Sequence, residues 1–119
     1  RAGGLLESKK IASVGEAFGA QIAPHCYNGP IGLAANIQLA ACSPNFLILE
    51  SIRDLTGFHA ELLTQPIGWE DGDVIPPEAP GLGVELDEDV ARAHPDNGER
   101  LHLTMWDEPI DRAEFDARP

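Results

Sequence analysis

Two short apolar runs constrain the fold of this chain more than any other feature. Residues 20–23 are mostly apolar and lead to His25, and residues 46–49 are wholly apolar and lead to Glu50. Runs of this kind are typical of parallel strands that are covered on both faces. A loop follows each ionisable residue, as it does at the carboxyl ends of strands in α/β proteins. We therefore expect two buried strands with polar side chains at their C-terminal ends.

A helix is predicted before each of these strands. Apolar residues recur near helical spacing from Leu5 to Val14, and Gly19 stands where a glycine commonly ends a helix. Residues 31–42 are rich in Ala, Leu and Ile, and this second helix is predicted to stop just before Pro44. Two helix–strand pairs cannot close a parallel sheet or cover its faces. We therefore expect these residues to belong to a larger protein.

The later part of the chain is richer in glycine and proline. Residues 62–63 and 74–75 are predicted to form the strands of a hairpin, with residues 69–72 supplying its turn. Asp87 is predicted to cap a short helix, because acidic residues follow it in the first turn. Residues 101–105 alternate in polarity and indicate one more strand.

Charge and cysteine content narrow the class of protein. The net charge of −12 argues against nucleic acids and anionic membrane surfaces as partners, since both need a basic face. No apolar run approaches the roughly 18 residues of a membrane span, and no signal peptide is visible. The two cysteines, Cys26 and Cys42, lack the spacing of a zinc site and are expected to be free thiols. A reducing, cytoplasmic location is therefore expected.

The chain carries several separate motifs in a consistent order from Arg1 to about His94. They are Arg1-Ala2-Gly3-Gly4, Lys9-Lys10-Ile11-Ala12, Ala23-Pro24-His25, Gly29-Pro30-Ile31, Pro44-Asn45-Phe46, the run ending in Glu50, and residues 80–87. This set resembles the enolase superfamily. The branch it resembles most is that of mandelate racemase, and within it the galactonate dehydratase-like sugar-acid dehydratases.

The resemblance implies an α/β fold, the C-terminal part of a modified (β/α)₈ TIM barrel. Residues 1–56 would form the end of that barrel, including strands seven and eight. Residues 57–119 would return to an N-terminal capping domain that is absent from this chain. A complete barrel needs roughly 250 residues, so most of it would lie elsewhere.

The resemblance also assigns roles to individual residues. His25 would be a catalytic acid/base that removes the proton next to a substrate carboxylate. Glu50 would hydrogen-bond that carboxylate, for which its own carboxyl group must be protonated. Cys26, Tyr27 and Asn28 follow His25 in a loop at the same end of the barrel, where loops often contact substrate.

Magnesium is the cofactor that the resemblance implies, since Mg²⁺ stabilises the enediolate formed by proton removal. Its carboxylate ligands, and an aspartate that pairs with His25, are expected upstream of Arg1, so this chain would hold no metal ligand. Loss of a hydroxyl as water would convert a sugar acid to a 2-keto-3-deoxy acid. A small sugar acid and further copies of the same protein, in a homo-oligomer, are the expected partners.

Three alternatives remain open at this level. A racemase or epimerase of the same branch would return the proton without losing water. A muconate cycloisomerase-like activity fits less well, because that branch lacks a histidine at the end of strand seven. The chain could also be a non-catalytic binding or assembly module.

The remaining histidines and tryptophans are not expected to act in catalysis. His59, His94 and His102 lack the spacing of metal ligands and are expected at the surface or at an interface. Trp69 and Trp106 are expected to pack against the capping domain.

Overall fold

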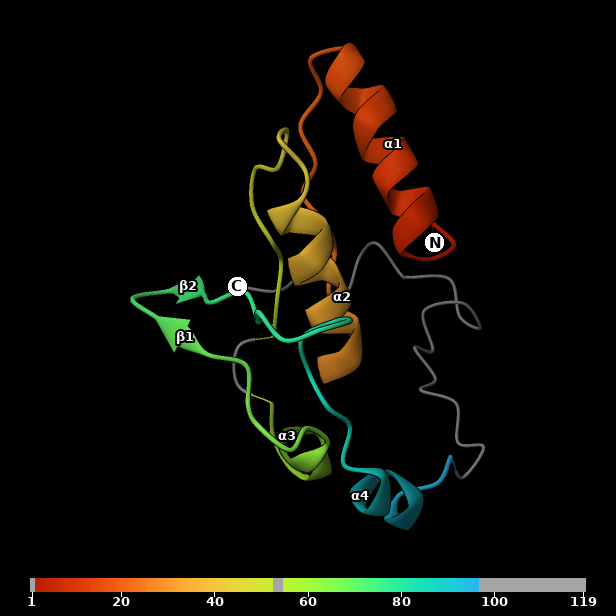
Figure 1. The fold of residues 1–119 in the computed structure, drawn as a ribbon, viewed down its shortest axis with the longest axis vertical. Helices are drawn as coiled ribbons and strands as arrows, with labels where there is room; N and C mark the ends of the chain where they lie inside the picture. Colours follow the sequence, from red (N-terminus) through yellow and green to blue (C-terminus); the bar gives the residue numbers. More distant parts are fainter. Residues whose placement is uncertain (1, 53–54, 97–119) are drawn as a thin grey trace, which may run out of the picture.

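A computed structural model of the chain describes residues 2–52 and 55–96. Its elements, in chain order, are α1 (Leu5–Ala17), α2 (Pro30–Ala41), α3 (Phe58–Glu61), β1 (Trp69–Glu70), β2 (Asp73–Val74) and α4 (Glu88–Ala93). Helix α1 packs beside α2, the β1–β2 hairpin projects to the other side of α2, and α3 and α4 lie beyond its N-terminal end (Figure 1).

The first predicted helix is confirmed as α1. Gly19 follows it with a φ of 71°, and the Gly19 N–H donates to the Glu16 carbonyl at 2.9 Å, which closes the helix in a left-handed turn. Ala12 is the buried residue of this helix. Most of the apolar surface of α1 therefore faces outward.

The second predicted helix is confirmed as α2, the central element. Pro30 occupies its first turn, where the missing N–H of proline has no consequence for the helix. The helix ends at Ala41, shortly before Pro44, and the Ser43 hydroxyl donates to the Leu39 carbonyl at 2.7 Å just beyond that end. The residues of α2 that are buried are Pro30, Leu33, Ala34, Ile37 and Leu39.

The core is a small cluster around α2. Cys26, Leu33 and Ile37 are buried at its centre, and four partly buried residues pack around them: Leu49, Ile67, Trp69 and Val74. The hairpin thus supplies part of the core. Trp69 is partly buried against this cluster, and its expected packing against a capping domain stays a prediction.

The two predicted strands pair in parallel, but they form only an isolated bridge between Ile22 and Phe46. The Ile22 N–H donates to the Asn45 carbonyl at 2.9 Å, and the Leu47 N–H donates to the Ile22 carbonyl at 2.9 Å. The parallel direction is the one expected from the alternation of helices and apolar runs. The prediction of regular strands is wrong for this chain.

Burial of these two segments was also predicted incorrectly. Leu47 is 59% exposed and Ile48 is 62% exposed. A parallel strand is buried by further strands at its edges and by helices on both faces. Within the described residues each segment pairs only with the other, so the side chains lack the neighbours that would bury them.

The hairpin differs in register from the prediction. Its strands, β1 and β2, flank Asp71 and Gly72, whose φ angles of 50° and 93° suit a two-residue turn. That short turn forces the adjoining residues to pair with each other. Residues 62–63 therefore take no part in the hairpin, and Leu63 instead forms an antiparallel bridge with Leu86.

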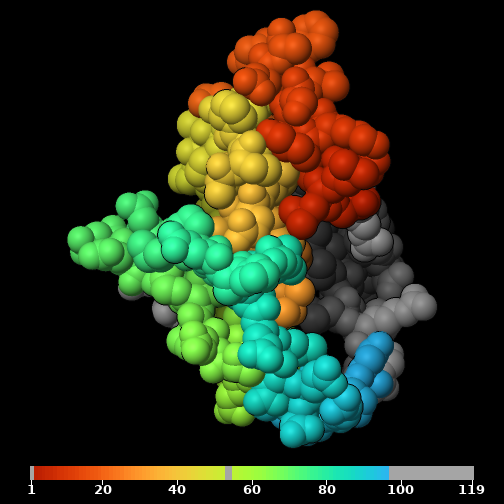
Figure 2. All heavy atoms as spheres, viewed as in Figure 1, coloured from red at the N-terminus to blue at the C-terminus, as the bar shows by residue number. Residues whose placement is uncertain are grey.

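Residues 76–83 cross α2 on the side shown in Figure 2, where they cover part of the helix. The Gln38 side chain donates to the carbonyls of Pro77 and Leu82, at 3.0 and 3.3 Å. Gly83, with a φ of 75°, lies directly against Pro77: a Cβ at this position would be 2.5 Å from the Pro77 Cβ. The segment is therefore closed on itself and fixed to α2.

The last predicted helix is confirmed as α4. The Asp87 carboxylate accepts from the backbone N–H groups of Asp89 and Val90, both at 3.0 Å, as an N-cap does. Helix α3 was not predicted, and it meets the end of α4 where Phe58 stacks on His94, with ring centroids 4.4 Å apart. The strand predicted at residues 101–105 lies outside the described residues.

Candidate active site

The parallel pairing brings His25 and Glu50 together. The Glu50 N–H donates to the Pro24 carbonyl at 3.2 Å, so the two apolar segments end side by side. There, Nδ1 of His25 and Oε2 of Glu50 are joined by a hydrogen bond. Two ionisable residues that are 25 positions apart thus form one site.

Both side chains of this pair are open to solvent, with exposed fractions of 73% for His25 and 60% for Glu50. Water screens the attraction between them, so the pair contributes little to stability. The hydrogen bond matters because it orients the His25 ring. When Nδ1–H donates to the carboxyl oxygen, Nε2 is the nitrogen left free to accept or return a proton. The arrangement suits a general acid/base whose orientation is set by a carboxyl group.

The pairing of His25 with Glu50 was not predicted from the sequence. From the resemblance, His25 is expected to pair with an aspartate outside this chain, and Glu50 is expected to hydrogen-bond the substrate carboxylate. The signal that points to the pair is the parallel arrangement itself, because parallel strands bring their carboxyl ends to the same edge.

In the loop after His25, one side chain points into the core and the next two point toward solvent. Cys26 is only 2% exposed and belongs to the core cluster. Tyr27 is 73% exposed, and Asn28 is also exposed. Tyr27 and Asn28 are therefore accessible to solvent in the loop that follows His25, and their contact with substrate stays a prediction. A substrate contact of the Cys26 side chain stays a prediction, and its burial among Leu33 and Ile37 does not favour it.

Asn45 maintains the register that creates the site. Its side-chain nitrogen donates to the carbonyls of Ala12 and Ala20, both at 2.9 Å, which connects α1, the first apolar segment and the start of the second. The Asn45 carbonyl also accepts from Ile22. Asn45 was not singled out as a functional residue, although it lies within one of the sequence motifs.

The described residues do not by themselves fit Mg²⁺. This ion prefers an octahedral set of oxygen ligands, and within residues 2–52 and 55–96 no group of three or more His, Cys, Asp and Glu side chains gathers where it could hold a metal. The carboxyl group that contacts His25 is that of Glu50.

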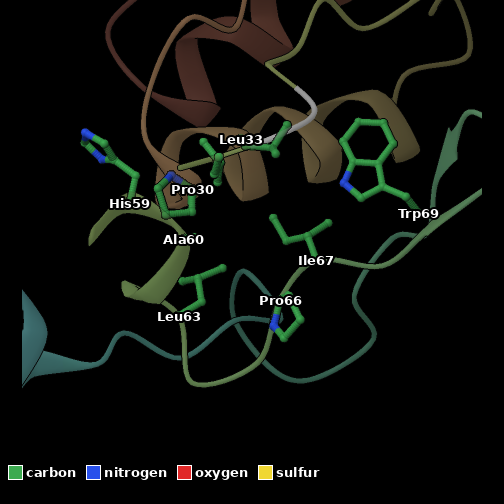
Figure 3. A pocket seen from close by; sticks show the side chains of 9 residues that line it. Pro30, Leu33, His59, Ala60, Leu63, Pro66, Ile67 and Trp69 are labelled. Carbon is green, nitrogen blue, oxygen red and sulfur yellow. The ribbon is translucent and has the colours of Figure 1, made fainter. Parts of the chain in front are cut away.

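An apolar cavity of about 270 Å³ lies away from this pair. Figure 3 shows its walls converging from α2, α3 and the segment leading to β1, with the His59 ring turned outward. The lining residues are Pro30, Leu33, Leu55, His59, Ala60, Leu63, Pro66, Ile67 and Trp69. Neither His25 nor Glu50 lines this cavity, and the side chains of both are exposed at the surface. Among the described residues, no helix has the length and hydropathy needed to cross a membrane.

The helices, the parallel bridge and the His25–Glu50 pair are those of an α/β fold, and comparison with known proteins identifies its family. Residues 1–90 match the family described as "Enolase C-terminal domain-like". The chain belongs to this family, and thus to the enolase superfamily, as the sequence motifs predict. The domain of this family is part of a TIM barrel, which agrees with the predicted class of fold.

Three curated relatives cover most of the chain. It is 38% identical to D-xylonate dehydratase of Haloferax volcanii over 85% of its length, and 36% identical to D-galactonate dehydratase of Xanthomonas oryzae pv. oryzae over 88%. It is 39% identical to muconate cycloisomerase 1 of Rhodococcus opacus over 77%. The matched regions are only 24%, 29% and 25% of these proteins, respectively. The chain therefore spans about a quarter of the length of its relatives.

Solved structures agree with this assignment. A crystal structure from Labrenzia alexandrii, assigned to the mandelate racemase/muconate lactonizing enzymes, is 65% identical to this chain with a TM-score of 0.78. A crystal structure of a mandelate racemase/muconate lactonizing enzyme from Jannaschia sp. is 50% identical with a TM-score of 0.75. The matches cover 87% of this chain and 27% and 26% of those chains, respectively.

Proposed function

We propose that this chain supplies a catalytic acid/base, His25, to a sugar-acid dehydratase that converts an aldonate to a 2-keto-3-deoxy acid. The observation that carries the proposal is the hydrogen-bonded His25–Glu50 pair at the adjoining ends of two parallel-paired segments. Relatives named D-xylonate dehydratase and D-galactonate dehydratase support the reaction class. Tyr27 and Asn28, exposed beside the pair, would contact the sugar hydroxyls.

The chemistry follows from the two nitrogen atoms of His25. With Nδ1–H held by Glu50, Nε2 takes the proton from the carbon next to the substrate carboxylate, and the C–H electrons form an enediolate. The hydroxyl on the following carbon then leaves as water with a proton from a general acid, a role that protonated His25 can fill. The resulting enol tautomerises to the 2-keto acid.

Glu50 can serve His25 and the substrate at the same time. Its Oε2 is the atom that meets Nδ1 of His25. If the carboxyl group is protonated on Oε1, that O–H can donate to the substrate carboxylate as negative charge builds on it. One carboxyl group would then orient the base and stabilise the anion that the base creates.

Magnesium belongs to the proposal through the superfamily, not through residues of this chain. When bound, Mg²⁺ would neutralise the charge that develops on the substrate carboxylate. The ligands of Mg²⁺ are expected upstream of Arg1. In the same proposal, residues 1–56 end a (β/α)₈ barrel with strands seven and eight, and residues 57–119 return to a capping domain. We also propose that the enzyme is a cytoplasmic homo-oligomer. Its substrate would be a small sugar acid, and it would have no nucleic acid or membrane partner.

A screen of the complete enzyme tests this function. It would be incubated with a library of aldonates and Mg²⁺, and 2-keto acid formation would be measured, with EDTA as the control for metal dependence. Product from at least one acid, lost on addition of EDTA, is expected. No product from any acid would overturn the dehydratase proposal.

The same pair would also support a racemase or epimerase, because proton removal is common to both reactions. Turnover in D₂O distinguishes the two activities. A racemase incorporates deuterium next to the carboxylate of recovered substrate without forming a keto acid, whereas a dehydratase accumulates the keto acid. Deuterium exchange without keto acid would therefore favour the alternative.

A further inference from the structure

The loop that precedes α2 is fixed from three directions. Cys26 is buried in the core, and the Gly29 carbonyl accepts from the Leu33 N–H at 3.1 Å as α2 begins. Between these points the Asn28 side chain lies against Gly32 in the first turn of α2. A Cβ built on Gly32 would be 2.8 Å from the Asn28 Cβ and 2.9 Å from its Nδ2.

This contact explains a glycine inside a helix. Glycine lowers helix stability relative to alanine, and Gly32 does not need the positive φ that favours glycine. What it provides is space. Since the nearest atom to the added Cβ is the Asn28 Cβ and not the end of a flexible side chain, any larger residue would displace Asn28 or the loop.

The polar groups of Asn28 are open to a ligand. The side chain is exposed, and within residues 2–52 and 55–96 no hydrogen bond joins its amide to another protein group. An amide offers two N–H donors and a carbonyl acceptor. Asn28 is therefore held by steric contact while its hydrogen-bonding capacity stays free, three residues after His25.

We propose that Asn28 reads a hydroxyl of the substrate and that Gly32 is the positioning residue that sets its orientation. This inference deepens the proposed dehydratase function and rests on it. The polyhydroxylated part of an aldonate is the ligand class, because an amide can donate to one hydroxyl and accept from its neighbour. The Asn28–Gly32 contact would then influence which stereoisomer is preferred.

A double-mutant cycle in the complete enzyme tests the coupling. Gly32→Ala, Asn28→Gly and the double variant would be compared for kcat and KM on the preferred aldonate and on an epimer that differs at one hydroxyl. Each single variant is expected to raise KM for the preferred acid by roughly three- to tenfold, the effect of one hydrogen bond, with kcat little changed. The preference for it over the epimer should fall by a similar factor.

The double variant separates positioning from general damage. Asn28→Gly removes the Cβ that an alanine at position 32 would meet, so the double variant is expected to resemble Asn28→Gly alone. If Gly32→Ala fails to fold, the double variant should fold and Asn28→Gly should still lower the epimer preference. Independent, multiplying effects, or an unchanged epimer preference in Asn28→Gly, would overturn the inference.

Gly15→Ala is the matched control. Gly15 is also a helical glycine, but an added Cβ would meet its neighbours only at 3.7 Å or more, an ordinary contact distance. This variant should leave KM and epimer preference unchanged. Because all of these measurements need an aldonate that the enzyme already turns over, a failure of the dehydratase proposal would appear earlier, as an inactive wild type.

Discussion

At the residue scale, the candidate site depends on a few backbone bonds more than on burial. The bond from the Glu50 N–H to the Pro24 carbonyl aligns the two side chains, and Asn45 secures the same register further along. His25 and Glu50 themselves remain solvent-exposed. A site of this kind needs other parts of the protein to exclude water before its electrostatic effects become large.

Glu50→Gln tests the carboxyl group of this pair. The amide can still hydrogen-bond Nδ1 of His25, but it lacks the acid O–H and its charge-stabilising donor strength. We expect kcat of the complete enzyme to fall by roughly 10²-fold, as for loss of one donor to a developing anion, with a much smaller change in KM. Steady-state kinetics measure both.

Glu70→Gln is the matched control, because Glu70 is an exposed carboxylate on β1 that takes no part in the pair. It should leave kcat unchanged. Equal losses in binding and rate from Glu50→Gln would contradict the role of Glu50 in the chemical step.

The sequence predicted the two strand-end residues but not their mutual contact. His25 and Glu50 stand out because each ends an apolar run. Cys26 shares the loop with Tyr27, and nothing in the local pattern shows that one side chain turns into the core while the other turns out. That distinction depends on contacts with Leu33 and Ile37, which come from another element.

At the element scale, the segment from Pro77 to Gly83 provides a test of packing. Gly81 and Gly83 both have a φ of 75°, but only Gly83 faces a neighbour: an added Cβ would meet Pro77 at 2.5 Å, whereas nothing lies within 4 Å at Gly81. The pair therefore separates backbone strain from steric clash.

Gly81→Ala should destabilise the complete protein by about 1–2 kcal/mol, the cost of a left-handed conformation for a residue with a Cβ. Gly83→Ala should cost about 1–3 kcal/mol more, because the chain must also move away from Pro77. Chemical denaturation of the two variants measures the difference. Equal destabilisation would show that the Pro77 contact is relaxed in solution.

Helices were predicted better than strands, for a physical reason. The bounds of α1, α2 and α4 follow from local signals, namely Gly19, Pro44 and Asp87. The two apolar runs indicate a parallel sheet, but within the described residues each run pairs only with the other, so only a bridge forms. The hairpin register depends on the two-residue turn at Asp71 and Gly72, which is shorter than the turn predicted at residues 69–72.

At the scale of the whole molecule, much apolar surface is left uncovered. Phe18 is 85% exposed, and several other large apolar residues on α1 and on the second apolar segment are also exposed: Leu6, Ile11, Val14, Leu47 and Ile48. Exposed large apolar residues that gather into a patch normally mark a contact surface. They fit the proposal that this chain, which spans about a quarter of the length of its relatives, packs against the rest of a barrel.

The isolated 119-residue polypeptide should therefore behave differently from an independent domain. We expect it to bind a hydrophobic dye and to self-associate, and the double variant Phe18→Ser with Ile48→Thr to reduce both effects. Dye fluorescence and analytical ultracentrifugation measure them, with Gln21→Ser as a polar surface control. A stable monomer that binds no dye would instead favour the alternative of a self-sufficient binding or assembly module.

Turnover by the His25→Asn variant of the complete enzyme tests most directly whether His25 transfers the substrate proton. With the aldonate identified in the screen, kcat should fall by at least about 10³-fold, within the range for loss of a general acid/base, while Mg²⁺ affinity and thermal stability stay unchanged. His59→Asn, at an exposed histidine outside the pair, should retain activity. Near-normal turnover by His25→Asn would contradict the account.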